Sequence, residues 1–207
     1  MKYSKDDIKN LDKRIRGSFV NSLSGFKSLN LIGTISESGV QNVAIFNSVI
    51  HLGADPALLG MISRPDSVAR HTLENIRQTG FYTINGISVD FFENAHHTSA
   101  RFDESEFAAC SLNPLYKEKF KAPFVKESPL QIGMKLVREI AIDENGTSLI
   151  IGSIESVELE NSACDESGYV DLEKLNLTAG VSLEGYYKPT LIARLEYAKP
   201  EKPTRRK

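Results

Sequence analysis

The chain of 207 residues carries 25 Lys and Arg against 27 Asp and Glu, a formal net charge of −2. Hydrophobic residues make up 41% and charged residues 25%, the balance of an ordinary soluble globular protein. This balance leaves no surplus of positive charge for a nucleic-acid surface, and no apolar run approaches the ~20 residues that a membrane span needs.

We therefore expect one cytoplasmic domain over residues 1–207. Residues 1–15 are charged and polar, which is typical of an N-terminal arm or a short helix, and residues 200–207 form a basic tail. The two cysteines, Cys110 and Cys164, lie far apart, so the sequence predicts neither a disulfide framework nor a zinc site. We expect Cys110 to be a small core residue.

Strand patterns begin at Leu29. Apolar and polar residues alternate from there to Ile35, a Glu-Ser-Gly turn follows, and residues 43–46 are apolar, which predicts a β-hairpin over 29–46. The apolar stretch at 57–63 lies between two Pro-containing turns and predicts a third strand.

The periodicity changes over residues 67–79. Ser67 and Thr72 are good N-cap residues and Gly80 is a good residue to follow a helix, so we expect a helix that ends at Gly80. A strand resumes at 81–85. Two short helical segments are expected at 89–100 and 105–110.

The second half of the chain is rich in strand patterns. Residues 132–142 and 148–159 flank Asn145-Gly146, which strongly favours a hairpin, and residues 190–197 alternate enough to predict a closing strand. Strands outnumber helices, and one helix lies between two early strands. This order favours a closed or nearly closed barrel with helices over its ends, rather than a doubly wound sheet.

A candidate anion site lies between the third strand and the helix that follows it. Ser63 and Arg64 end the strand, and Arg70, His71 and Thr72 lie in the expected first turn of the helix. Unpaired N–H groups at a helix start, next to Arg and hydroxyl donors, bind anions well. An ordinary capped surface helix has the same pattern and is the alternative interpretation.

Several short motifs occur in a characteristic order: Asn47-Ser48, Asp55-Pro56, Arg64-Pro65, His71-Thr72, Asn75-Ile76, Thr79-Gly80, Thr83-Ile84-Asn85, the segment 96–102, and Tyr186-Tyr187-Lys188-Pro189. Together these motifs resemble the flavin-reductase-like, FMN-binding split-barrel family, and its flavoredoxin-like branch in particular. The resemblance covers roughly residues 19–200.

The resemblance implies a mainly β fold, a six-stranded Greek-key-like split barrel with flanking helices. It also implies a homodimer with FMN in a groove at or near the dimer interface. The implied cofactor-binding residues are Asn47, Ser48 and Val49 along the flavin ring, Ser63, Arg64, His71, Thr72 and Asn75 around the phosphate, and Ser99 and Arg101 at the phosphate or the rim. Tyr186 and Tyr187 are expected near the flavin.

The same resemblance implies an oxidoreductase that passes electrons from NADH or NADPH through FMN to free flavin, a ferric chelate or a protein acceptor. We find no catalytic dyad or triad, and bound flavin would carry the demanding chemistry itself. No G-x-G-x-x-G motif follows a strand, so a nicotinamide would bind in the flavin groove.

Two alternatives stay open at this point. One is a flavoredoxin-like electron carrier without a nicotinamide site, and the other is a non-enzymatic module that binds FMN or haem. Only His96-His97 hints at haem. Adjacent helical residues diverge by ~100°, so this pair does not suggest a shared metal.

Overall fold

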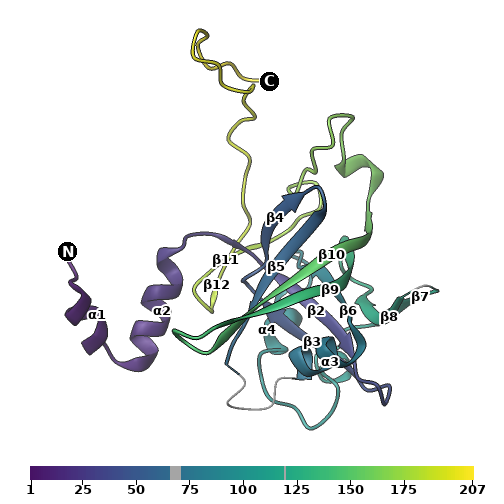
Figure 1. Ribbon diagram of the computed structural model, residues 1–207. Helices are drawn as coiled ribbons and strands as arrows, with labels where there is room; N and C mark the ends of the chain where they lie inside the picture. The colour runs from purple at the N-terminus through teal and green to yellow at the C-terminus, as the bar shows by residue number, and fades with distance from the viewer. Residues whose placement is uncertain (66–70, 119) are drawn as a thin grey trace.

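The computed structural model describes residues 1–65, 71–118 and 120–207 (Figure 1). Its helices are α1 (Lys5–Asn10), α2 (Lys13–Leu23), α3 (His71–Thr79), α4 (Phe92–His97), α5 (Glu106–Ala109) and the 3-10 helix η1 (Asn161–Ala163). Its strands are β1 (Lys27–Ser28), β2 (Asn30–Ile35), β3 (Gln41–Phe46), β4 (Ile50–Ala54), β5 (Ala57–Ser63), β6 (Phe81–Gly86), β7 (Pro114–Lys117), β8 (Phe120–Val125), β9 (Leu130–Ile142), β10 (Thr147–Leu159), β11 (Ala179–Val181) and β12 (Gly185–Tyr187).

The main sheet has the strand order β3-β2-β6-β9-β10-β5-β4, and every neighbouring pair is antiparallel. Its two edge strands, β3 and β4, are consecutive in the chain and are separated by only residues 47–49. The two edges must therefore lie close together, and the sheet closes into a barrel. If β3 and β4 are counted as one interrupted strand, the barrel has six strands, which agrees with the predicted split barrel.

Ser48 connects the two edges at the interruption. Its Oγ donates a hydrogen bond to the backbone oxygen of Ile62 in β5, at 3.0 Å, and accepts one from the Ile62 N–H, at 3.2 Å. The Ser48 side chain thus forms hydrogen bonds with both the backbone N–H and the backbone C=O of Ile62, as a neighbouring strand would. The Ser48 hydroxyl is part of the barrel closure.

Two apolar clusters lie on the two faces of the β2–β3–β6 region. The first fills the barrel interior and includes Tyr82, Ile84, Met134 and Ile150 together with Ile76 of α3. The barrel wall approaches Tyr82 closely, since a Cβ at Gly152 would meet the Tyr82 hydroxyl oxygen at 2.2 Å.

The second cluster lies outside the barrel, under α4 and α5. It includes Leu31 and Val43 of the hairpin, Ala95 of α4, Phe107 of α5 and Cys110. Burial raises the pKa of the Cys110 thiol, with a smaller contribution from the nearby Glu106 carboxylate. Cys110 is therefore a core residue, as predicted.

Most of the predicted elements are present. The first hairpin, the strand at 57–63, the strand after Gly80 and the long hairpin around Asn145-Gly146 are all confirmed. Helix α3 ends at Thr79, and Gly80 adopts the left-handed conformation, with φ of 72°. The expected N-cap Ser67 lies outside the described residues.

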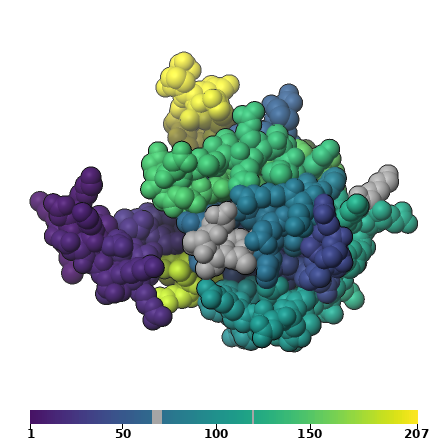
Figure 2. Space-filling view, turned by 60° about the horizontal axis from the view of Figure 1, so that its bottom comes forward, coloured from purple at the N-terminus to yellow at the C-terminus, as the bar shows by residue number. Residues whose placement is uncertain are grey.

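Three expectations differ from the structure. Residues 190–197 are not a strand: they pair with no strand of the main sheet, and only an isolated bridge joins Leu195 to Arg206. The helix expected over 89–100 is limited to α4. The N-terminal helical region extends beyond residue 15, to the end of α2, and projects from the side of the barrel (Figure 2).

In the described part of the chain, no helix is long and apolar enough to cross a membrane.

The barrel closure can be tested with Ser48→Ala. This change leaves the backbone N–H and C=O of Ile62 without their side-chain partner, so we expect a loss of about 1–3 kcal/mol in the free energy of unfolding. Urea denaturation of the flavin-free protein measures it. The control Ser38→Ala removes an exposed hydroxyl and should change stability by less than about 0.5 kcal/mol. Equal unfolding midpoints for the two variants would contradict the closure role.

Candidate functional site

A cleft of about 860 Å³ lies beside the interruption between β3 and β4. Its walls come from the end of β3, the end of β5, the start of α3, the segment that follows α4, and the turn between β11 and β12. Asn21 of α2 also lines it. Segments that are distant in the sequence therefore meet at one place on the barrel.

The cleft brings together eight of the ten residues that the sequence predicts as cofactor-binding. They are Asn47, Ser48, Ser63, Arg64, His71, Thr72, Ser99 and Arg101. The other two do not line it. Val49 packs against the barrel interior, and Asn75 is buried with its Nδ2 donating to the Thr34 Oγ1 at 3.1 Å.

A buried polar network fixes the start of α3 against the first hairpin. The Nδ2 of Asn42 donates to Oγ1 of Thr72 at 3.0 Å and to Oγ1 of Thr34 at 3.3 Å, and Asn75 also donates to Thr34. Thr72 acts in these bonds only as an acceptor. Within the described residues its own O–H therefore has no acceptor, and it can donate to a group in the cleft.

Asn47 is held by residues from both ends of the chain. Its Nδ2 donates to the backbone oxygen of Ser182 at 3.0 Å and to Oδ1 of Asn21 at 3.4 Å. Ser18 of α2 also lies 2.8 Å from Ser182, Oγ to Oγ. Because these contacts occupy the amide N–H₂ group, the Asn47 Oδ1 is left as the acceptor of this side chain.

Tyr186 provides an aromatic side chain in the cleft. Its hydroxyl lies 2.8 Å from Nδ1 of His96, and its ring packs against Phe92 with centroids 5.1 Å apart. Partial burial raises the pKa of Tyr186. His97 instead packs edge-on against Phe102, so the adjacent histidines have different partners.

The charges around the cleft are mixed. Arg64, His71 and Arg101 line it together with three acidic residues, Asp103, Glu106 and Glu184. Among the residues that the structure describes, neither the Arg64 nor the Arg101 guanidinium forms an ion pair or hydrogen bond. Both cations are thus available to an anionic ligand. Arg70, which the sequence places in the same anion site, lies outside the described residues.

Several lining residues were missed by the sequence analysis, notably Asn21, Asn42 and the 182–185 turn. Asn21 and Ser182 meet Asn47 only through long-range folding, and no local motif marks them. The described side chains include no group of three or more His, Cys, Asp or Glu that could hold a metal ion.

Several solved structures have the same fold as this chain. A proposed flavin reductase with a split barrel domain from Shewanella frigidimarina NCIMB 400 is 50% identical, with a TM-score of 0.92 over 96% of this chain and 100% of that chain. Nitrilotriacetate monooxygenase component B from Bacillus cereus is 18% identical, with a TM-score of 0.81 over 92% of this chain and 96% of its own. Flavoredoxin of Desulfovibrio vulgaris (Miyazaki F) is 23% identical, with a TM-score of 0.70 over 85% and 91%.

The last two similarities show the fold alone, because their sequence identities are low. The sequence itself matches the family described as "Flavin reductase like domain" over residues 25–175, which is most of the chain. That match includes β2 to β10 and eight of the cleft residues that the sequence predicts. The protein belongs to the flavin reductase like domain family and has its split-barrel fold.

Proposed function

We propose that this protein binds FMN in the cleft and acts as an NAD(P)H-dependent oxidoreductase. The observation that carries the proposal is the convergence of eight predicted cofactor residues on one cleft, although they come from four separate segments of the chain. The Shewanella protein, at 50% identity, carries the name of a flavin reductase, which supports the same class of reaction.

The size and chemistry of the cleft fit this cofactor. Its volume of about 860 Å³ is near the upper end of the ~300–1,000 Å³ range of small-molecule sites. Phe46, Phe102 and Tyr186 offer aromatic surface for a planar ring, and the Arg64 and Arg101 guanidinium groups, which have no partner among the described residues, offer charge for a phosphate.

The phosphate would bind where β5 ends and α3 begins. Arg64 supplies a guanidinium, Thr72 supplies an O–H that has no acceptor among the described residues, and His71 and Ser63 line the same region. Among the described residues, the acidic side chains of the cleft come from other segments: Asp103 follows α4, Glu106 begins α5 and Glu184 lies in the β11–β12 turn. An anion is therefore favoured at the β5–α3 end.

The ring would lie against the interruption between β3 and β4. Ser48 can contribute only its backbone there, because its hydroxyl is bonded to Ile62. Asn47 presents an amide oxygen whose orientation is fixed by Asn21 and Ser182, and such an acceptor suits a ring N–H. Ser99 and Arg101 complete the rim.

Bound FMN would supply the redox chemistry, accepting a hydride from NADH or NADPH and passing electrons to free flavin, a ferric chelate or a protein. The chain's own residues bind and orient the reactants and exclude water from the ring face. We assign no side chain as a general acid or base. The nicotinamide would enter the same cleft, opposite Tyr186 and His96.

We also propose a homodimer, supported by an apolar patch on the outer face of the sheet. Ile62 pairs with Leu149, and Leu149 pairs with Ile140, so the three side chains share the outer face. Ile50 and Leu52 extend this row on β4 and are 47% and 39% exposed. Because Ile62 also lines the cleft, a second copy on this face would adjoin the cofactor site.

Arg64→Ala tests the phosphate contact. A charge-assisted hydrogen bond contributes about 1.5–3 kcal/mol, so we expect FMN to bind about tenfold to a hundredfold more weakly while riboflavin affinity stays unchanged. Titration of flavin fluorescence measures both dissociation constants. Arg14→Ala, which removes an exposed arginine of α2 outside the cleft, is the matched control. An equal loss for FMN and riboflavin would show that Arg64 does not contact the phosphate.

The proposed reaction predicts that NADH or NADPH bleaches the flavin absorbance of the FMN-loaded protein under anaerobic conditions. Stopped-flow absorbance measures the rate with each nicotinamide. A flavin-loaded protein that neither nicotinamide reduces, but that a reduced ferredoxin-like donor does, would instead be an electron carrier. A protein that takes up no FMN at all would contradict the proposal that the cleft is an FMN site.

Ile140→Asp tests the dimer face. Ile140 is 41% exposed and lies outside the cleft, so a charge there should convert a dimer to a monomer of about 23.0 kDa without altering any side chain that lines the cleft. Light scattering after size exclusion measures the mass. Val40→Asp makes the same kind of change at a 63% exposed position in the β2–β3 turn and should leave the dimer intact. If both variants remain dimers, the dimer interface lies elsewhere on the protein.

A further inference from the structure

The last 20 residues, 188–207, form a C-terminal arm that leaves the barrel after β12 and projects away from it (Figures 1 and 2). The end of the arm folds back on itself. Leu195 and Arg206 form an antiparallel bridge, the Glu196 N–H donates to the oxygen of Arg205, and the Lys207 N–H donates to the oxygen of Arg194, each at 3.0 Å.

The arm exposes large apolar side chains. Ile192 is 91% exposed and Tyr197 is 88% exposed, while Leu191 and Leu195 are about half exposed. An isolated two-stranded hairpin is at best marginally stable in water. The folded end of the arm, residues 195–206, therefore needs another surface to pack against. Four apolar residues on one projecting segment indicate that another surface covers them.

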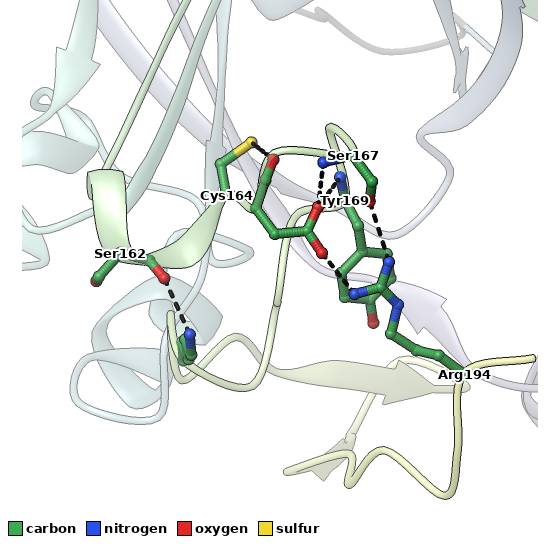
Figure 3. Close-up of polar contacts among 7 residues, drawn as sticks. Ser162, Cys164, Ser167, Tyr169 and Arg194 are labelled. Carbon is green, nitrogen blue, oxygen red and sulfur yellow. Dashed lines mark hydrogen bonds and ion pairs between the residues drawn. The ribbon is translucent and has the colours of Figure 1, made fainter. Parts of the chain in front are cut away.

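The base of the arm is firmly attached to the body. Arg194 forms an ion pair with Asp165 and donates to Ser167, and its guanidinium lies 3.9 Å from the centre of the Tyr169 ring (Figure 3). The Leu191 N–H also donates to the Glu173 carboxylate at 3.1 Å. These contacts, which we call the clasp, hold the arm in one direction.

The clasp keeps its charge over the whole physiological range of pH. Hydrogen bonds from Ser167 and Arg194 hold the pKa of Asp165 well below its usual value. Because the pKa of Asp165 is depressed, its ionised carboxylate stabilises the folded clasp at any pH above the ordinary value of 3.8. This stabilisation is lost only as the pH falls below that value. A fixed base with an uncovered tip is the arrangement of a preorganised binding element.

The charge of the arm indicates what covers it. Residues 188–207 contain seven Lys and Arg against two Glu, a net charge of +5. Since the whole chain has a net charge of −2, the other 187 residues carry −7. The arm and the body of this protein are therefore complementary in charge, and the clasp directs the arm away from its own body.

We propose that the C-terminal arm packs against the acidic body of a second copy of this chain, with Ile192 and Tyr197 as its apolar anchors. The proposal rests on the homodimer proposed above and adds a second contact to it. It commits to a protein surface because the apolar anchors and the basic residues are joined on one folded, clasped segment.

The test is the double variant Ile192→Asp, Tyr197→Asp in the full-length protein. We expect the dimer dissociation constant from sedimentation velocity to rise at least tenfold, because two anchors are lost and two negative charges face an acidic surface. FMN affinity, measured on the same samples, reports separately on the cofactor site. Raising the salt concentration should also weaken the wild-type dimer, because screening reduces the attraction between arm and body.

Val40→Asp is the control for an added carboxylate, since it places one negative charge at an exposed apolar position in the β2–β3 turn, away from the arm (Figure 1). An unchanged dissociation constant in the double variant, with a dimeric wild type, would overturn the arm proposal and leave the dimer itself intact. A monomeric wild type that binds FMN would overturn both the dimer and the arm, but not the cofactor site. Arm-dependent binding to vesicles of anionic lipid, with no effect on dimerisation, would assign the arm to a membrane surface instead.

Discussion

The break between β3 and β4 is the constraint on which the rest of the structure depends. A sheet whose two edge strands are consecutive in the chain brings its edges together and closes into a barrel. At the interruption between them, Ser48 bonds to Ile62 of β5 through both polar functions of its hydroxyl. Ser48 also lines the cleft, so the candidate site lies at the point where the strand between β3 and β4 is interrupted.

The residues around this break divide into those that support the cleft and those that are left available to a ligand. Asn42 and Asn75 use their amide donors to fix Thr34 and the start of α3. Asn47 uses its own donors on Asn21 and Ser182. What remains toward the cleft is a hydroxyl donor on Thr72 and an amide acceptor on Asn47, which are groups of opposite character fixed by separate networks. Such an arrangement can distinguish a phosphate from a ring N–H without any mobile side chain.

Local patterns in the sequence were sufficient for most of the strands, and eight of the ten predicted cofactor-binding residues line the cleft. Asn145-Gly146 and the apolar run at 57–63 predict their elements because turn geometry and burial act over a few residues. Eight cleft residues could be predicted because they lie in short motifs that resemble a family. Asn21 and Ser182 could not, since each meets Asn47 only after the two ends of the chain have folded onto the barrel. Asn75 belongs to a predicted motif but faces the core, a distinction that depends on how α3 is rotated against the hairpin.

The incorrect strand at 190–197 has a physical cause that connects the arm with the rest of the molecule. Alternating apolar residues satisfy a strand pattern whether they face a core or the surface of a partner. In this chain residues 190–197 pair with no strand of the main sheet, and Ile192 and Leu195 lie exposed outside the barrel. Ile62, by contrast, is half-buried and belongs both to the cleft and to the outer apolar face of the sheet. If a second copy on that face changes the affinity of the cleft for a ligand, then by linkage the ligand changes the affinity between the copies by the same factor.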